Sequence, residues 1–178
     1  MKMIAIDPSS TKTGYAVMEY GRLIEAGLLT GDRQRDRYTE RVDAMCLALN
    51  RLLDEYKPLN AVIELSSGAP GTGSRSGASA SLIMYGYATG AIDRELMHHP
   101  GVMALWRYTE QEWIGRRGGV ATSKKARQAT VQALYRDYDP QDDKGGDVSD
   151  AICLGLWFER GACDRKAADF ARSVSVGG

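Results

Sequence analysis

The stretch from Ile4 to Val17, IAIDPSSTKTGYAV, restricts the fold more than any other part of this chain. A short apolar run ends in an acid, a turn rich in small residues follows, and a second apolar run begins. This pattern is typical of two hairpin strands with Asp7 at the end of the first. A carboxylate at a strand end can anchor a hard divalent cation, although Asp before Pro-Ser-Ser is also ordinary turn chemistry. The positions of the other acids decide between these two interpretations.

Length and composition favour one domain with a substantial core, since the 178 residues are 43% hydrophobic and 26% charged. No apolar run approaches the roughly 20 residues that span a membrane, and the chain begins directly with a strand pattern. We therefore expect neither a membrane segment nor a secretory signal. The three cysteines show no metal-ligand spacing, which favours a reducing, intracellular compartment.

The net charge of zero hides an uneven distribution of charge along the chain. Residues 103–136 hold seven Lys and Arg against two Glu, and residues 137–150 hold six Asp against one Lys. A basic surface beside a concentrated acidic site suits an enzyme that holds a polyanion on cations and cuts it with metal ions. Random clustering on solvated helix faces is the alternative.

Hydrophobic periodicity predicts an alternation of strands and helices after an initial group of three strands. We expect strands over 3–7, 15–20, 22–29, 60–64 and 101–106, and helices over 36–57, 80–97, 109–115, from Thr122 or Ser123 to about 138, and 147–160. Residues 66–79 form a loop rich in Gly and Ser. This order predicts an α/β fold with a mixed five-stranded sheet flanked by helices.

Four acids come from three of these elements. Asp7 and Glu64 end strands that lie side by side if the fourth strand pairs with the first. Asp147 and Asp150 are three residues apart, hence on one face at a helix start, although acids there also stabilise helix ends. Four neighbouring carboxylates repel each other unless cations bind among them. The set suits two-metal phosphodiester hydrolysis with Asp7 bridging two Mg²⁺ ions, because no His or Cys ligand set accompanies it.

Four motifs in order resemble a known family. They are Ile6–Ser9 with Thr13–Tyr15, Val62–Glu64, Gly119–Lys124 and Asp147–Ala151. Over residues 3–158 the chain is similar to the RuvC-type Holliday-junction resolvases of the ribonuclease H-like superfamily. Residues 65–68, directly after Glu64, include no aromatic residue, where the family can stack one on junction bases. The long Gly/Ser-rich loop and the compact length suggest a phage-like or otherwise divergent branch.

The resemblance implies catalytic carboxylates at Asp7, Glu64, Asp147 and Asp150, which also hold two Mg²⁺ ions, with Mn²⁺ as a substitute. It implies a lysine near the scissile phosphate at Lys124, with Lys125 as the alternative. The ribonuclease H-like nuclease domain is expected over residues 1–161, followed by a C-terminal tail over 162–178. The predicted DNA-binding residues are all cations: Arg75, Arg107, Arg116, Arg117, Lys124, Lys125 and Arg127. Tyr108 and Trp113 could equally pack in the core or contact DNA.

The implied function is resolution of four-way junction DNA by paired phosphodiester hydrolysis, in a bacterial or phage-encoded cytoplasmic protein. Implied partners are a branch-migration helicase and a second copy of the chain, with the helix over 80–97 as the homodimer interface. Three alternatives stay open. They are a nuclease of this fold for other branched DNA or RNA, a junction-binding module without catalysis, and an ATP-binding or phosphotransfer protein, which normally needs two copies of the domain.

Overall fold

The computed structural model describes residues 2–31, 37–65 and 77–162. The strands are β1 (Lys2–Asp7), β2 (Lys12–Glu19), β3 (Arg22–Thr30), β4 (Asn60–Leu65) and β5 (Ala104–Thr109). The helices are α1 (Tyr38–Tyr56), α2 (Gly77–His98), α3 (Glu110–Trp113), α4 (Gly115–Gly118), α5 (Lys124–Leu134), α6 (Asp147–Trp157) and a π-helical turn η1 (Phe158–Ala162). In these residues no helix is both long and apolar enough to cross a membrane.

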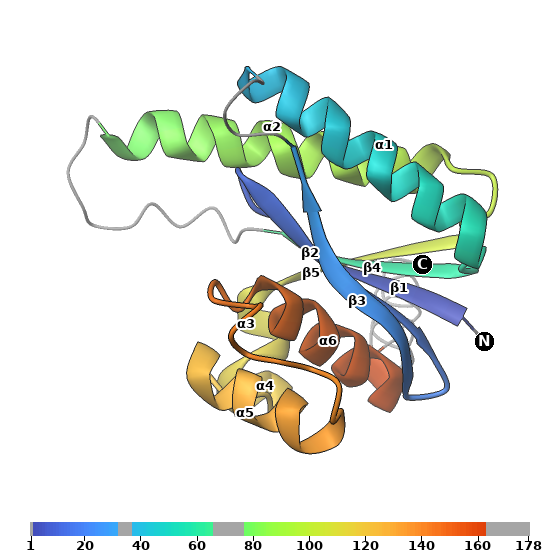
Figure 1. The fold of residues 1–178 in the computed structure, drawn as a ribbon, viewed down its shortest axis with the longest axis vertical. Coiled ribbons are helices and arrows are strands. Elements are labelled where there is room, and N and C mark those ends of the chain that lie inside the picture. Colours follow the sequence, from blue (N-terminus) through green and yellow to red (C-terminus); the bar gives the residue numbers. More distant parts are fainter. Residues whose placement is uncertain (1, 32–36, 66–76, 163–178) are drawn as a thin grey trace, which may run out of the picture.

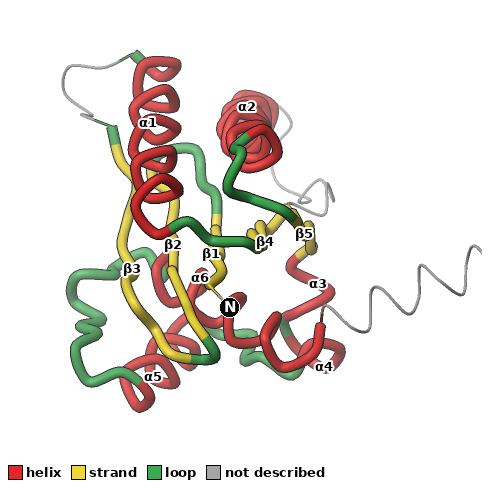
Figure 2. Tube along the Cα trace, turned by 90° about the vertical axis from the view of Figure 1, so that its right-hand side faces the viewer, coloured by secondary structure: helices red, strands yellow, loops and turns green. Residues whose placement is uncertain are grey.

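The strands form one mixed sheet in the order β3-β2-β1-β4-β5, which confirms the predicted fold class. The first three strands are antiparallel, and β4 lies parallel to both β1 and β5. Helices α1 and α2 cover one face of the sheet, and α3 to α6 cover the other (Figure 1). Figure 2 shows the same two layers from the side. Because β1 and β4 are parallel, their carboxyl ends meet at one edge.

Alternation along the strands separates two hydrophobic cores. Ile4 and Ile6 pack with α1 and α2, whereas Met3 and Ala5 pack with α6. The same alternation directs Asp7, the next odd residue, toward the α6 layer. In β4, Val62 belongs to the α6 core, so Glu64 also faces that layer.

The sequence predicts the fifth strand over 101–106, whereas β5 begins and ends three residues later, at Ala104 and Thr109. Gly101 and Val102 form a turn, in which their backbone N–H groups donate to His99. Pairing with β4 therefore starts at Ala104, opposite Asn60, and continues to Thr109. The shift places Tyr108 beside Glu64.

The predicted helix ending near 138 is also too long. Helix α5 begins after Ser123, whose hydroxyl accepts from the Ala126 N–H as expected, but it ends at Leu134. Tyr135 has extended backbone and donates its hydroxyl to the Gly21 carbonyl of the β2–β3 turn. Tertiary contacts of this tyrosine thus replace the last helical turn. Residues 163–178 of the predicted tail lie outside the described residues.

Candidate active site

Asp7 and Glu64 lie at the carboxyl ends of β1 and β4, on the face that α6 covers. Asp7 is buried, and burial followed by repulsion from Glu64, Asp150 and Asp147 raises its pKa well above the usual value. Burial likewise raises the pKa of Glu64 to about 7, against the hydrogen bond from Trp113, which lowers it. The sheet therefore holds two carboxylates close to the other acids, in surroundings that disfavour their charges.

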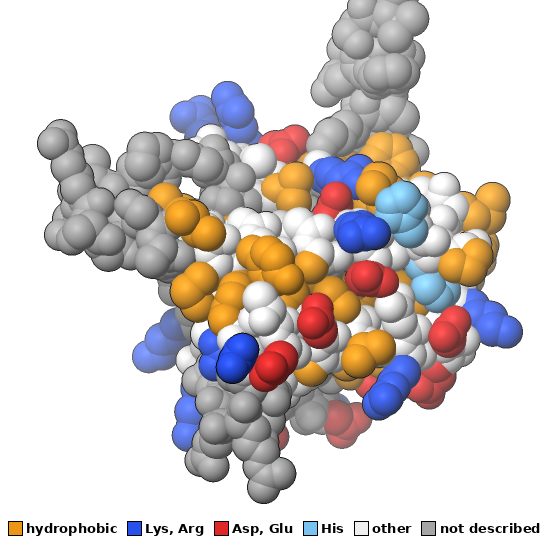
Figure 3. Space-filling view, turned by 90° about the horizontal axis from the view of Figure 1, so that it is seen from above, with side chains coloured by type: hydrophobic (Ala, Val, Ile, Leu, Met, Phe, Trp, Pro, Cys, Tyr) orange, Lys and Arg blue, Asp and Glu red, His pale blue; other side chains and the backbone are white. Residues whose placement is uncertain are grey.

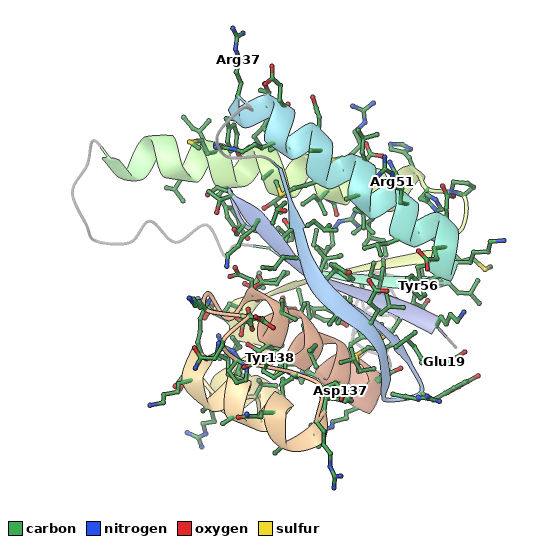
Figure 4. All side chains as sticks on the ribbon, in the orientation of Figure 1. Glu19, Arg37, Arg51, Tyr56, Asp137 and Tyr138 are labelled. Carbon is green, nitrogen blue, oxygen red and sulfur yellow. The ribbon has the colours of Figure 1, made fainter. Side chains whose placement is uncertain are left out.

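Asp147 and Asp150 are presented by the first turn of α6, which another acid caps. Both oxygens of Asp143, a buried residue, accept from the backbone N–H groups of Val148 (3.1 Å) and Ser149 (2.8 Å). Tyr138 donates its hydroxyl to the same carboxylate and lies on the α6 side of the sheet (Figure 4). Asp143 thus accepts hydrogen bonds from backbone N–H groups in the first turn of α6, so the carboxylates of Asp147 and Asp150 are not used for capping.

Gly14 allows α6 to approach the sheet at the site. It lies in β2 opposite Asp7, and a Cβ atom on it would fall 1.9 Å from the Asp147 carbonyl oxygen. Any side chain at this position would collide with backbone. The glycine thus brings the α6 acids to the strand acids.

Two lysines contact the α6 carboxylates. Lys124 Nζ lies 3.5 Å from Asp147 and 3.3 Å from Asp150, and Lys12 Nζ lies 3.0 Å from Asp147. The side chains of Lys12 and Lys124 are 23% and 53% exposed, so both ammonium groups reach the site from its solvent side. Although burial opposes it, the acids, Asp150 foremost, raise the pKa of Lys124, which keeps its charge.

The donor set fits a hard divalent cation, because carboxylates at one edge supply the oxygen ligands that Mg²⁺ prefers. The buried oxygen Oδ2 of Asp147 is paired with the ammonium group of Lys12, 3.0 Å away. In the described ranges, no three His, Cys, Asp or Glu side chains are gathered closely enough to hold one ion. Lysine ammonium groups contact the α6 acids instead, so ion binding requires them to withdraw.

Two of the predicted DNA-binding arginines are engaged elsewhere. Arg127 is 3% exposed and forms a bidentate ion pair with Asp150, so the packing of α5 against α6 directs it inward. Arg107 lies on the opposite side of the sheet, where its guanidinium pairs with Asp93 of α2 (2.7 Å). Both guanidinium groups thus form ion pairs with acids of the chain, and their contact with DNA stays a prediction.

The other residues predicted to contact DNA differ in their exposure to solvent. Lys125 is exposed on α5, as are Arg116 and Arg117 on α4. Arg75 lies outside the described residues. Tyr108 and Trp113, which left two possibilities open, are both buried and serve packing.

Sequence reasoning missed Lys12, the capping role of Asp143 and the close approach at Gly14. For Lys12, its position five residues after Asp7, at the start of the second hairpin strand, was an available signal. Asp143 was counted only as one of six acids, since its contacts with α6 depend on how the preceding loop folds back.

Comparisons with known proteins identify the fold. No protein-family model matches the sequence, and no curated protein does. Among solved structures, a T. thermophilus RuvC in complex with a Holliday junction substrate aligns with a TM-score of 0.65 and 18% identity, covering 88% of this chain and 91% of that one. A second T. thermophilus RuvC structure aligns with a TM-score of 0.61 and 18% identity, covering 88% and 92%. The chain therefore has the RuvC fold.

Proposed function

We propose that this protein is a metal-dependent endonuclease that resolves four-way DNA junctions. The observation that carries the proposal is the convergence of Asp7, Glu64, Asp147 and Asp150 at one edge of a RuvC fold. The similar T. thermophilus protein was solved with a Holliday junction substrate, and this supports the same class of substrate here.

Asp7 and Glu64 would hold one Mg²⁺, and Asp7 with Asp147 or Asp150 would hold the other. Bound ions would supply a water nucleophile and stabilise charge at the leaving oxygen. The sheet fixes the backbone of Asp7 opposite Gly14, and capping by Asp143 fixes the first turn of α6, so both elements would hold their carboxylates in place for ion binding. The ammonium groups of Lys12 and Lys124 would then turn from the acids to the scissile phosphate.

Cleavage assays on synthetic substrates test the function directly. We expect Mg²⁺-dependent paired nicks in a labelled four-way junction and little cutting of a linear duplex of the same sequence. Equal cutting of other branched DNA or RNA would favour a broader nuclease. Tight junction binding without cleavage in Mg²⁺ or Mn²⁺ would favour a binding module.

Lys124 rather than Lys125 is expected to be the catalytic lysine, because its Nζ lies 3.5 Å from Asp147 and 3.3 Å from Asp150. We expect Lys124→Ala to slow cleavage at saturating junction and Mg²⁺ by about 10²-fold, the usual cost of one charge-stabilising donor. Lys125→Ala is the matched control. It should mainly weaken binding and flatten its salt dependence. A slower saturated rate for Lys125→Ala alone would reverse the assignment.

A homodimer is expected through α2, which presents apolar side chains to solvent. Leu82, Ile83 and Tyr87 are 48%, 72% and 47% exposed. Figure 3 shows hydrophobic side chains gathered on the face of the molecule seen from above. A two-fold protein places one site on each of the two symmetric strands of a junction. Sedimentation should therefore give about twice the chain mass of 19.4 kDa.

Ile83→Glu is expected to produce monomers, since it places a charge in the proposed interface. Leu47→Glu is the matched control, because Leu47 is 62% exposed on α1 and should not affect association. A wild-type monomer that remains monomeric on junction DNA would rule out the dimer.

A further inference from the structure

Two buried side chains lie behind the proposed metal ligands. Trp113 and Arg127 are 0% and 3% exposed, and each one contacts a different carboxylate of the site. The proposed reaction does not use either of them directly. They differ in this from Lys12 and Lys124, whose ammonium groups reach the same site from the solvent side.

Arg127 is fixed by hydrogen bonds on both sides of its guanidinium. Nε and Nη2 donate to the two oxygens of Asp150, at 2.5 and 3.0 Å. Nη1 donates to the carbonyls of Ala121 and Thr122, each at 2.9 Å, in the loop before α5. A bidentate pair of this kind sets the plane of the carboxylate as well as its position. Asp150 is thereby tied to the α5 layer.

Trp113 makes the corresponding contact with Glu64, the acid at the end of β4. Its indole Nε1 donates to Glu64 Oε2 at 2.8 Å. The Arg127 guanidinium lies over the same indole ring, 5.7 Å from its centre, within cation–π range. Glu64 and Asp150 are thus connected through two side chains that touch each other.

The backbone around Trp113 leaves its side chain little freedom to move. Helix α3 is closed by the Thr109–Glu112 capping box. At Gly118, an added Cβ would fall 1.8 Å from the Trp113 carbonyl oxygen, so α4 packs directly against that carbonyl. The indole is consequently held in place by its own helix and by the next one.

We propose that Trp113 and Arg127 form one positioning unit that holds Glu64 and Asp150 in the arrangement that binds divalent metal. This proposal rests on the proposed nuclease function and assigns neither residue a contact with substrate. Outer hydrogen bonds to metal ligands orient them, and losing one typically costs 10–100-fold in metal affinity or activity. The same range is expected here.

Trp113→Phe tests the unit, because it removes the N–H donor and keeps an aromatic ring under Arg127, and the ring volume that it also removes is matched by a control. Mn²⁺ binding to the DNA-free protein, measured by calorimetry, should weaken about 10-fold or more. The Mg²⁺ concentration for half-maximal cleavage should rise by the same factor, with most of the rate recovered at saturating metal. Junction affinity in EDTA should stay at the wild-type value.

Trp157→Phe is the matched control. Trp157 is also buried in the α6 core, and its Nε1 has no hydrogen-bond partner in the described part of the chain. The control removes as much ring from the same core but no contact with a carboxylate. It should leave the metal affinity of the protein unchanged.

Arg127→Lys keeps the positive charge but loses the bidentate pair of hydrogen bonds to Asp150. It should therefore weaken Mn²⁺ binding as well. Because the two side chains act as a unit, the double variant should lose less than the product of the single losses. Wild-type Mn²⁺ affinity in Trp113→Phe would overturn the proposal, even if Arg127→Lys fails to fold. Failure of the nuclease function is seen separately, as a wild type that binds Mn²⁺ and cuts no junction.

Discussion

Asp7→Asn should abolish junction cleavage while leaving junction binding intact. Asp7 is expected to ligate both ions, and metal ligation contributes several kcal/mol to the transition state, so the rate should fall by about 10³-fold or more. Binding depends on contacts between cations and phosphates, which this change does not touch. The assay compares single-turnover cleavage with electrophoretic mobility of the same labelled junction.

The same variant should be more stable than the wild type when metal is absent. Asp7 is buried and is repelled by Glu64, Asp150 and Asp147, and Asn removes this repulsion at almost equal volume. Thermal unfolding in EDTA measures the effect. Asp142→Asn is a suitable control, since Asp142 is exposed and should change neither stability nor cleavage. Cleavage by Asp7→Asn at more than a few per cent of the wild-type rate would refute the assignment of the site.

Gly14→Ala should damage both stability and catalysis. The new methyl group would lie 1.9 Å from the Asp147 carbonyl oxygen and 2.4 Å from its carbon, and both atoms belong to the backbone. Overpacking of this kind costs about 1–3 kcal/mol of unfolding free energy. If α6 moves by about 1 Å to relieve the clash, its carboxylates move with it, which costs about 10²-fold in rate. Urea unfolding and saturated cleavage rates measure the two effects.

Gly27→Ala provides the matched control in the neighbouring strand. The three atoms nearest to its added Cβ would belong to the Tyr15 side chain, at 3.0–3.2 Å, and a side chain can adjust more easily than backbone. We expect a smaller loss of stability and wild-type cleavage. Equal cleavage by Gly14→Ala and Gly27→Ala would show that the close approach at Gly14 does not position the site.

The strands of the site were predictable because their signals are local. Apolar runs that end in Asp7 and Glu64, with turn residues after Asp7, are visible without any tertiary information. The same holds for the three-residue spacing of Asp147 and Asp150, which places two acids on one helical face. These patterns, together with the order of the motifs, led to the RuvC fold that the structural comparison confirms.

The end of α5 and the start of β5 could not be read in this way. Both depend on contacts with distant residues, namely Tyr135 with Gly21 and Ala104 with Leu59. Local propensity is a weak guide where such contacts compete with it.

The sequence by itself determined which acids form the candidate site, because strand ends and helix faces follow from short-range periodicity. Only the tertiary structure decided which Lys and Arg side chains are buried and which remain exposed to solvent. Arg127 and Lys124 are three residues apart on α5, yet Arg127 is buried on Asp150 while Lys124 reaches the acids from the solvent side. Whether a charged side chain is buried depends on the residues that pack against it. Arg127 is buried because α5 packs against α6 and because Trp113 lies beside its guanidinium.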